Sequence, residues 1–240
     1  MLEFNFIDYI KRVSQRPQAG LIACTYGEFV AFICGLDAAG EPSELEGFRE
    51  WLCIKRGRLS GFAWCKLALV MWDIDLPSYV TGSKELHLKA IQGLTELILE
   101  FYNDETKKMA IQSYNKWQIE FHKGKIHLPE EKVFKFNFVD YIKKASKHVG
   151  IFLAESTYGE FVALIKGIEV GSELIKLDRF QEWLCKKQGQ NSDEVWSKLA
   201  LIIMDIDLPS YVSGSKELHL KAIQGLTELI LEFYPEKNKI

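Results

Sequence analysis

The chain has 240 residues, 48% of them hydrophobic and 26% charged, which is an ordinary composition for a globular protein. Its formal net charge of −3 argues against a general nucleic-acid-binding protein, because such proteins usually carry a strongly basic face. Acidic residues near the start argue against a signal peptide, and the longest apolar runs, such as 67–72, are far too short to span a bilayer, so we expect a soluble protein without a membrane partner.

The first predicted helix covers residues 5–15. Its apolar residues are spaced three and four apart, which places them on one face of a helix. They are Phe6, Tyr9, Ile10 and Val13. The helix is expected to end at Arg16-Pro17, because the residue before a proline avoids the helical backbone region.

The second predicted helix begins with a capping box, in which the side chains of Thr25 and Glu28 each bond the other residue's backbone N–H, and the same pair recurs as Thr157 and Glu160. Gly35 lies near the C-terminal end of this helix. The third predicted helix covers 43–55 and ends near Gly57, since glycine is a common helix stop. Its apolar residues are Leu45, Phe48, Trp51 and Leu52.

The fourth and fifth predicted helices are the most apolar. The fourth, 63–72, can also be read as a buried strand, but the helical spacing of its apolar residues favours a central helix. The fifth follows Gly82 and Ser83, and its apolar arc consists of Leu86, Ala90, Ile91, Leu94, Leu97, Ile98 and Phe101. Leu88 and Leu99 widen this arc, which predicts contact with a second element such as the other copy of the repeat described below.

Residues 103–132 lack the Gly and Ser content of a flexible linker. Their apolar and aromatic residues are Met109, Ile111, Tyr114, Trp117, Ile119 and Phe121. We predict a helix over 105–121 that packs on one or both neighbouring domains and holds them in a fixed relative placement.

The sequence from 133 onward repeats the beginning of the chain. Residues 1–102 align with 133–234 at a constant offset of 132 and without a gap, and 62 of the 102 aligned positions are identical. We therefore predict an all-α protein made of two tandem copies of a five-helix domain, at 1–102 and 133–234, joined by a helical linker at 103–132 and followed by a tail at 235–240. We expect the copies to form an intramolecular pseudo-dimer.

The identities are unevenly distributed along the repeat. Residues 1–72 match their counterparts at 33 positions, whereas 73–102 match 205–234 at 29 of 30 positions. One explanation is a recent duplication or a sequence exchange at the DNA level. The other is that this segment meets its own copy, or the same partner surface, in both halves.

The five cysteines do not suggest a disulfide framework. Their number is odd, no CxxC motif occurs, and only Cys53 has a cysteine counterpart, Cys185. A disulfide-stabilised domain would repeat its cysteine pairs in both copies. We therefore predict reduced thiols and a cytoplasmic location.

The sequence shows no recognised catalytic or metal-binding motif. It contains no glycine-rich phosphate loop, nucleophile elbow or HExxH motif. Only two histidines, His87 and His219, are equivalent, and neither has a second ligand at a convincing metal spacing. His87 falls on a mostly apolar helix face, which favours a core position. We predict a protein that is not an enzyme, with no catalytic residue, metal or cofactor.

Two carboxylates one residue apart occur in each copy, at Asp73 and Asp75 and at Asp205 and Asp207. Such a pair can bind a divalent cation or serve in acid–base catalysis, but both uses need further positioned groups, and none is identifiable. The following Leu-Pro indicates a helix end, with the acids in a solvated loop. Contact with a basic partner is the functional alternative.

A series of core and turn residues characterises the repeat, although not all of them recur in the second copy. In the first copy it comprises Arg16-Pro17, Tyr26, the run 32–39, the run 48–52, Trp64 and Glu100-Phe101. With these residues each copy resembles the small helical immunity proteins of bacterial polymorphic-toxin systems, over 204 of the 240 residues. The second copy departs at His148-Val149, which replaces Arg-Pro, and at 167–170.

The resemblance implies a protein that covers the active site or substrate surface of one cognate toxin. Toxins that act on nucleic acids or nucleotides commonly offer a basic cleft, which acidic loop residues would complement. No motif fixes the binding residues in such families. The candidates for partner binding are Asp37, Glu41, Asp73, Asp75 and Tyr79 with their counterparts Glu169, Glu173, Asp205, Asp207 and Tyr211.

Two other classes of function stay open. The chain can be a structural module, a fused pseudo-dimer in which the duplicated fifth helices build a symmetric interface. It can also be an enzyme with an unfamiliar site that uses Asp73 and Asp75. A bound metal or a deep polar pocket near those residues would support the enzyme.

Overall fold

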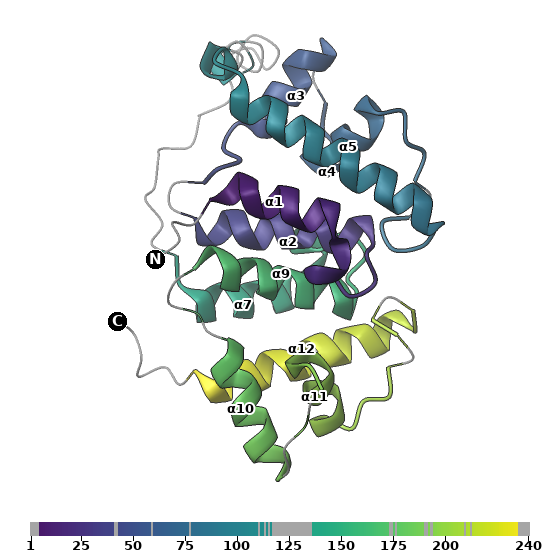
Figure 1. The fold of residues 1–240 in the computed structure, drawn as a ribbon, viewed down its shortest axis with the longest axis vertical. Helices are drawn as coiled ribbons and strands as arrows, with labels where there is room; N and C mark the ends of the chain where they lie inside the picture. The colour runs from purple at the N-terminus through teal and green to yellow at the C-terminus, as the bar shows by residue number, and fades with distance from the viewer. Residues whose placement is uncertain are drawn as a thin grey trace.

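A computed structural model describes residues 5–234 with the exception of 41–42, 59, 77, 110, 113, 115, 117–135, 173–174, 176, 190–191, 193, 209 and 212. All regular elements of this described part are helices (Figure 1). The prediction of an all-α protein is confirmed for these residues.

The two halves of the chain contain matching series of helices. The first half holds α1 (Phe6–Gln15), the short 3-10 helix η1 (Pro17–Ala19), α2 (Tyr26–Ala39), α3 (Phe48–Arg56), α4 (Trp64–Met71) and α5 (Lys84–Asn103). The second half holds α7 (Phe138–Lys147), α8 (Val149–Phe152), α9 (Tyr158–Gly171), α10 (Leu177–Gln188), α11 (Trp196–Ile203) and α12 (Lys216–Phe233). The starts of α1, α2, α4 and α5 each recur 132 residues later.

Side-chain caps begin the long helices as the sequence predicts. Asn5 accepts a hydrogen bond from the backbone N–H of Asp8 at the start of α1. In α9 both bonds of the predicted capping box are present between Thr157 and Glu160. In α2 Thr25 accepts from the Glu28 N–H in the same way. These bonds satisfy backbone donors that a helix leaves without an intrahelical acceptor.

The predicted third helix begins too early. The structure starts α3 at Phe48 because Gly47 adopts a left-handed backbone, with φ of +79°, which interrupts a helix. In the second half the equivalent position is Arg179, and α10 already begins at Leu177. The side chain of Ile111, from the segment after α5, occupies the space that a Gly47 side chain would need.

The fourth apolar segment is a helix, α4, and not a strand. The broad apolar arc of α5 packs mainly against α1 and α4 of its own half. Leu97 and Ile98, 3% and 0% exposed, show how deeply this arc is buried. The predicted contact of the fifth helix with a second element is confirmed, but the elements that cover its wide face are helices of the same half and not the other copy.

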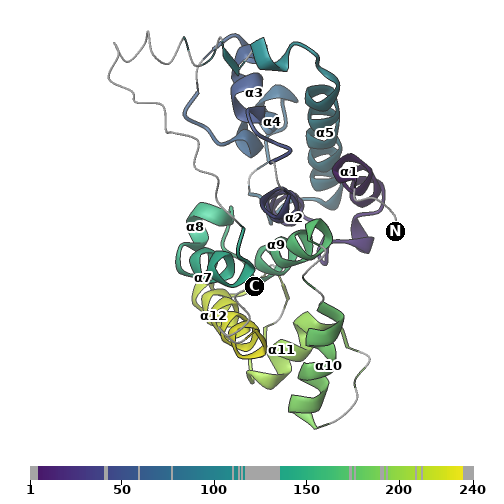
Figure 2. The same cartoon turned by 90° about the vertical axis from the view of Figure 1, so that its left-hand side faces the viewer.

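The two halves meet through α2 and α9, which lie side by side in the middle of the molecule (Figures 1 and 2). Small residues four positions apart form a stripe along each helix. These are Gly27, Ala31, Gly35 and Ala39 in α2, and Gly159, Ala163, Gly167 and Gly171 in α9. We call the contact along these stripes the seam. Small residues allow two helix backbones to approach closely.

The seam is parallel and close to symmetric. A Cβ atom at Gly35 would overlap the carbonyl oxygen of Leu164, and one at Gly167 would overlap that of Phe32. Near the N-terminal ends, Gly27 faces Glu160 in the same way that Gly159 faces Glu28. Each half thus makes the same contacts with the other, as two subunits related by a two-fold axis would.

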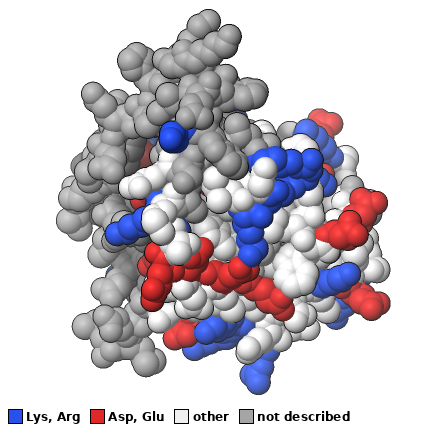
Figure 3. Space-filling view, turned by 90° about the horizontal axis from the view of Figure 1, so that it is seen from above, with Lys and Arg blue, Asp and Glu red and all other residues white. Residues whose placement is uncertain are grey.

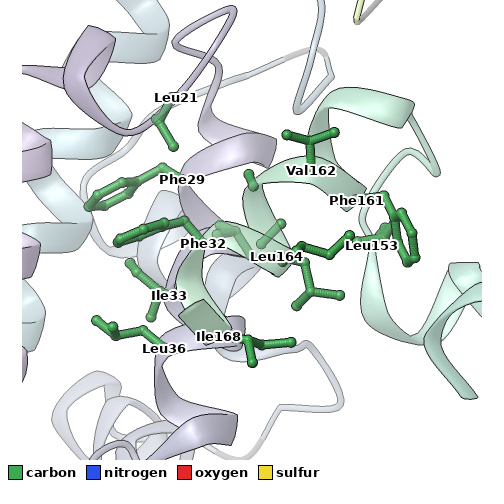
Figure 4. Close-up of a cluster of buried hydrophobic side chains, with 14 of the residues drawn as sticks. Leu21, Phe29, Phe32, Ile33, Leu36, Leu153, Phe161, Val162, Leu164 and Ile168 are labelled. Carbon is green, nitrogen blue, oxygen red and sulfur yellow. The ribbon is translucent and has the colours of Figure 1, made fainter. Parts of the chain in front are cut away.

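Large apolar side chains on both flanks of the seam join the halves into one hydrophobic cluster (Figure 4). In α2 ten of the 14 residues are buried, because one face meets its own half and the other meets α9. The proposed interface between the duplicated fifth helices is not found, since α5 and α12 lie on opposite sides of the seam (Figure 2).

The described start of the predicted linker packs on the first half. Tyr114 is buried, with 3% exposure, and its hydroxyl accepts a hydrogen bond of 2.9 Å from Arg49 of α3. Residues 107–109 are helical. Residues 111, 112, 114 and 116 are helical too, so the helix predicted over 105–121 is confirmed for these residues, and its part from 117 onward lies outside the described residues.

Candidate functional site

The paired carboxylates of each half lie in an exposed loop. Asp73 and Asp75 are exposed between α4 and α5, while the intervening Ile74 is buried and anchors the loop on the core. Asp205 and Asp207 are exposed in the same way in the second half. Asp73 and Asp205, the first acid of each pair, adopt a left-handed backbone with φ of 50° and 52°, a conformation that aspartate tolerates better than most residues.

The two candidate tyrosines pack inward from the same loops. The Tyr79 hydroxyl lies 3.7 Å from the sulfur of Cys65, and the Tyr211 hydroxyl lies 3.3 Å from the hydroxyl of Ser197. The Tyr79 carbonyl oxygen accepts a hydrogen bond of 2.8 Å from Gly27 N–H at the start of α2. Both rings are half-buried, so they hold the loop against the N-terminal end of the seam.

The candidate acids Asp37 and Glu169 hold the chain after α2 and α9. Asp37 accepts hydrogen bonds of 2.9 Å from the Ser43 hydroxyl and from Leu45 N–H. Glu169 accepts one of 2.9 Å from Leu177 N–H. These bonds give both carboxylates a structural role near the C-terminal ends of the two helices.

The structure therefore separates the acidic candidates into two groups. Gly27, which contacts the tyrosine loop, and Asp37 are ten residues apart on α2, a distance of about 15 Å along the helix axis. The loop acids and the helix-end acids do not form one site. Glu41 and Glu173 lie outside the described residues.

A buried histidine lies beneath each of these loops. His87 and His219 are 3% exposed, as predicted for core positions. Their Nδ1 atoms accept hydrogen bonds of 3.2 Å from the backbone N–H of Tyr26 and Tyr158, so Nε2 carries the proton in the neutral rings. Neither Nε2 has a partner among the described residues. Burial lowers the pKa of both rings.

Gly82, in the loop over His87, is exposed to solvent. A Cβ atom built on this glycine would lie 3.5 Å from Nε2 of His87, and the equivalent distance in the second half is 3.6 Å. The ring nitrogen therefore lies close to an exposed backbone segment in both halves. A buried donor without an acceptor is unusual and costs about 1–3 kcal/mol.

Most exposed positions outside one segment differ between the halves. Over 5–72, buried positions of the first half are identical in the second at 19 of 25 sites, but exposed positions at only 5 of 18. Over 73–102, exposed positions are identical at 11 of 12 sites. A partner that recognises both halves alike would find most of the shared exposed residues in this segment.

We call these eleven residues of each half the repeated surface. In the first half they are Asp73, Asp75, Gly82, Ser83, Lys84, Glu85, Lys89, Gln92, Glu96, Glu100 and Tyr102, and in the second half they are the residues 132 positions later. They follow the α4–α5 loop and then the solvent face of α5. The sequence singled out the two aspartates as candidates and the segment 73–102 as one that could meet the same partner surface in both halves, but it named no residue of the helix face as a candidate.

The repeated surface is acidic. It holds five carboxylates and two lysines in each half, a balance of −3. Glu100 forms an ion pair with Lys55, and its counterpart Glu232 pairs with Lys187 at 2.6 Å. Figure 3, which looks onto the first half from above, shows acidic side chains in a band across the face, with basic side chains on either side.

An apolar side chain lies beside each repeated surface. Trp72, 41% exposed, rests on Gly93 of α5, where a Cβ atom would be 2.9 Å from the indole ring. In the second half Met204 occupies the same place against Gly225. Tryptophan and methionine beside a charged surface are typical of protein interfaces.

The seam also contains buried charge. Glu28 and Glu160 are fully buried, and burial raises the pKa of both carboxyl groups, although backbone N–H donors partly offset this effect. Lys166 lies near Glu28, and its positive charge favours the ionised carboxylate. The equivalent residue in the first half is Cys34, whose pKa burial raises to about 12. These groups lie between helices and belong to the packing of the halves.

Three comparisons with known proteins give no family. No protein-family model, no curated protein and no solved structure matches the chain. Within the described part of the chain, no group of three or more His, Cys, Asp or Glu residues is arranged to hold a metal ion. No helix among the same residues has the length and apolarity needed to cross a membrane.

Proposed function

We propose that this protein is a non-catalytic binding protein that recognises another protein through its repeated surface. The observation that carries the proposal is the identity of the exposed residues of 73–102 in both halves. Exposed residues are not constrained by core packing, and elsewhere in the repeat they have diverged. Selection for one partner surface would keep them equal in both halves.

The partner that fits this surface is a protein with a basic face. Opposite charges on two surfaces accelerate association and exclude like-charged partners. We infer that the chain acts as an immunity protein, which neutralises a cognate bacterial toxin by covering it, because such toxins commonly present basic clefts to their nucleic-acid or nucleotide substrates.

The chain in this proposal consists of two tandem copies of a five-helix domain, paired as an intramolecular pseudo-dimer. The parallel seam between α2 and α9 supports the pairing, since each copy makes the same contacts with the other. All five cysteines carry free thiols, which is consistent with function in the reducing cytoplasm.

The seam also favours a second candidate function. A module whose role is purely structural would need only the pairing of α2 with α9 and no foreign partner. With a structural module, the equality of exposed residues far from the seam would come only from the recent duplication or sequence exchange named above, so we place it second.

The proposal is tested by affinity capture from the lysate of the source organism with the tagged full chain. A matched bait carries Asp75→Lys, Glu96→Lys, Asp207→Lys and Glu228→Lys, all at exposed positions of the repeated surface. We expect a basic protein in stoichiometric amount with the natural chain and at least a tenfold reduction with the variant.

A control bait carries Glu46→Lys, Glu105→Lys and Glu194→Lys, which are exposed acids outside the repeated surface. It should retain the partner like the natural chain. Equal retention by all three baits would show that the repeated surface is not the binding site. A natural chain that captures nothing would favour the structural module.

A further inference from the structure

The positions of the two repeated surfaces follow from the parallel seam. Because α2 and α9 run in the same direction with equivalent contacts, a half-turn about an axis between them exchanges the halves. Such a rotation carries any feature on one flank of the seam to the opposite flank. Figure 2, with α2 and α9 seen close to end-on, shows α5 and α12 on these opposite sides.

Each repeated surface is large enough to hold a partner of its own. The 20-residue helix α5 is about 30 Å long, close to the diameter of a small domain. A standard interface covers about 800 Å² of each partner, a patch of similar width. The residues of each surface all come from one half, although the backbone N–H of Tyr79, in the loop of the first surface, donates a hydrogen bond of 3.2 Å to Glu155 of the second half.

A second observation besides charge marks these surfaces. In both halves the unpartnered Nε2–H of the buried histidine lies directly below Gly82 or Gly214, which belong to the repeated surface. The same group is thus left without an acceptor twice, under the same exposed loop. An acceptor oxygen from a docked protein, reached by a small movement of the glycine segment, would satisfy this donor.

We propose that one chain binds two copies of a basic protein at the same time, one on each repeated surface. This inference rests on the proposed function and adds its stoichiometry. Each site offers five carboxylates, one of which is paired with a lysine of the same half, and an apolar side chain beside them, Trp72 in the first half and Met204 in the second. A partner rich in Lys and Arg with an apolar contact fits both sites. The helix faces of the two sites lie on opposite sides of the seam, whereas the loops before α5 and α12 lie at the same end of the molecule (Figures 1 and 2).

The experiment measures the mass ratio of the captured complex by native mass spectrometry. The probe is the set of lysate proteins retained by the full chain, and the readout is the ratio of partner to chain. Three variants are compared with the natural chain: Asp75→Lys with Glu96→Lys, Asp207→Lys with Glu228→Lys, and the control Glu105→Lys with Glu194→Lys. Circular dichroism and thermal unfolding establish that each variant is folded.

We expect two partner molecules for each natural chain and for each control chain. Each single-surface variant should bind one partner, and the combination of both should bind none. The partner should be a basic protein in every complex. A twofold drop in stoichiometry with unchanged affinity of the remaining site is the specific signature of two independent sites.

Other outcomes would overturn the inference in distinguishable ways. A ratio of one to one that both single-surface variants abolish would show one partner spanning both halves, and the proposed function would survive. A ratio of one to one that only one variant abolishes would show that a single surface binds the partner, and the proposed function would again survive. A full chain that retains no basic protein would overturn the proposed function as well.

Discussion

The most informative residues in the molecule are a pair of buried histidines. His87 and His219 each accept a hydrogen bond from the first residue of a seam helix, Tyr26 or Tyr158. The bond requires a neutral ring, because a protonated histidine has no acceptor nitrogen. The same side chains underlie the loops of the repeated surface, so their protonation would disturb both the seam and the surface.

This arrangement predicts a loss of stability in mild acid. The folded-state pKa of each histidine is lowered by burial, so its contribution to stability is complete above the unfolded pKa of about 6.5 and falls as the pH drops towards the folded pKa. Each histidine contributes at most about 1.4 kcal/mol per pH unit. The free energy of unfolding, measured in urea between pH 7.5 and pH 5.5, should decrease over this range.

The double variant His87→Asn with His219→Asn isolates this effect. The asparagine oxygen can take the place of Nδ1 as acceptor, and it does not titrate. The pH dependence of unfolding should be shallower in this variant than in the natural chain. His148→Asn, at an exposed position, is the control and should keep the natural profile. An unchanged profile in the double variant would refute the role assigned to the histidines.

The buried carboxyl groups of Glu28 and Glu160 change the stability with pH in the opposite direction to the histidines. Their pKa is raised by burial, so their contribution to stability is complete below the unfolded pKa of 4.5 and is lost as the pH rises through the folded pKa. Between pH 4.5 and 6.5 the two effects oppose each other. The histidine variant is therefore needed to resolve them.

At the scale of elements, the seam depends on two glycines. Gly35 and Gly167 each face a carbonyl oxygen of the opposite helix, so any side chain there forces the helices apart. We expect Gly35→Ala to destabilise the protein by about 3 kcal/mol or more, because overpacking of a tight core site costs about 1–3 kcal/mol even where side chains can adjust. The midpoint of urea unfolding is the measurement.

Gly150→Ala provides the matched control for this substitution. Gly150 lies in the short helix α8, and no atom lies within 4 Å of a Cβ built on it. The change should be neutral or stabilise the protein by up to about 1 kcal/mol, because alanine restricts the unfolded chain. Equal effects of the two substitutions would mean that α2 and α9 pack less closely at Gly35 than the structure shows.

Much of the fold could be predicted from local sequence. The helix face of α1, the cap at Thr157 and the stop before Pro17 depend on neighbours within one or two turns, and these predictions are confirmed. The predicted start of the third helix was wrong, because the observed start of α3 depends on Gly47 and on Ile111, which is more than 60 residues away. The seam was missed although its stripe of small residues is visible, since spacing alone does not say which helix faces which.

The candidate site was predictable only in part for a similar reason. Asp73 and Asp75 stood out as a repeated motif, and the structure places them on the exposed loop that was expected. Asp37 looked equivalent in sequence, but it bonds Ser43 and Leu45 at the other end of α2. The contrast between exposed and buried identities needs the burial of each residue, which sequence alone does not supply.

At the scale of the whole molecule, pairing of the halves leaves each of them dependent on the other. A half without its partner would expose the apolar face of α2 that meets α9 and would leave Glu28 without Lys166 nearby. The fragment 1–116 is expected to form a homodimer through α2 that imitates the seam. Light scattering after gel filtration, over a range of concentrations, measures this association.

The same fragment with Gly35→Ala tests the route of association. This substitution should shift the fragment towards monomer, since it blocks the close approach of two copies of α2. A natural fragment that is folded and monomeric at high concentration would contradict the dependence of the halves on each other.

Covalent connection of the halves gives the seam a property that two separate chains lack. Association of free subunits weakens on dilution, whereas a linker keeps the second helix of the pair at a local concentration in the millimolar range, whatever the number of molecules present. The pairing of α2 with α9 therefore survives at expression levels where a homodimer of single copies would fall apart. Even a few molecules per cell would each retain both halves in their assembled arrangement.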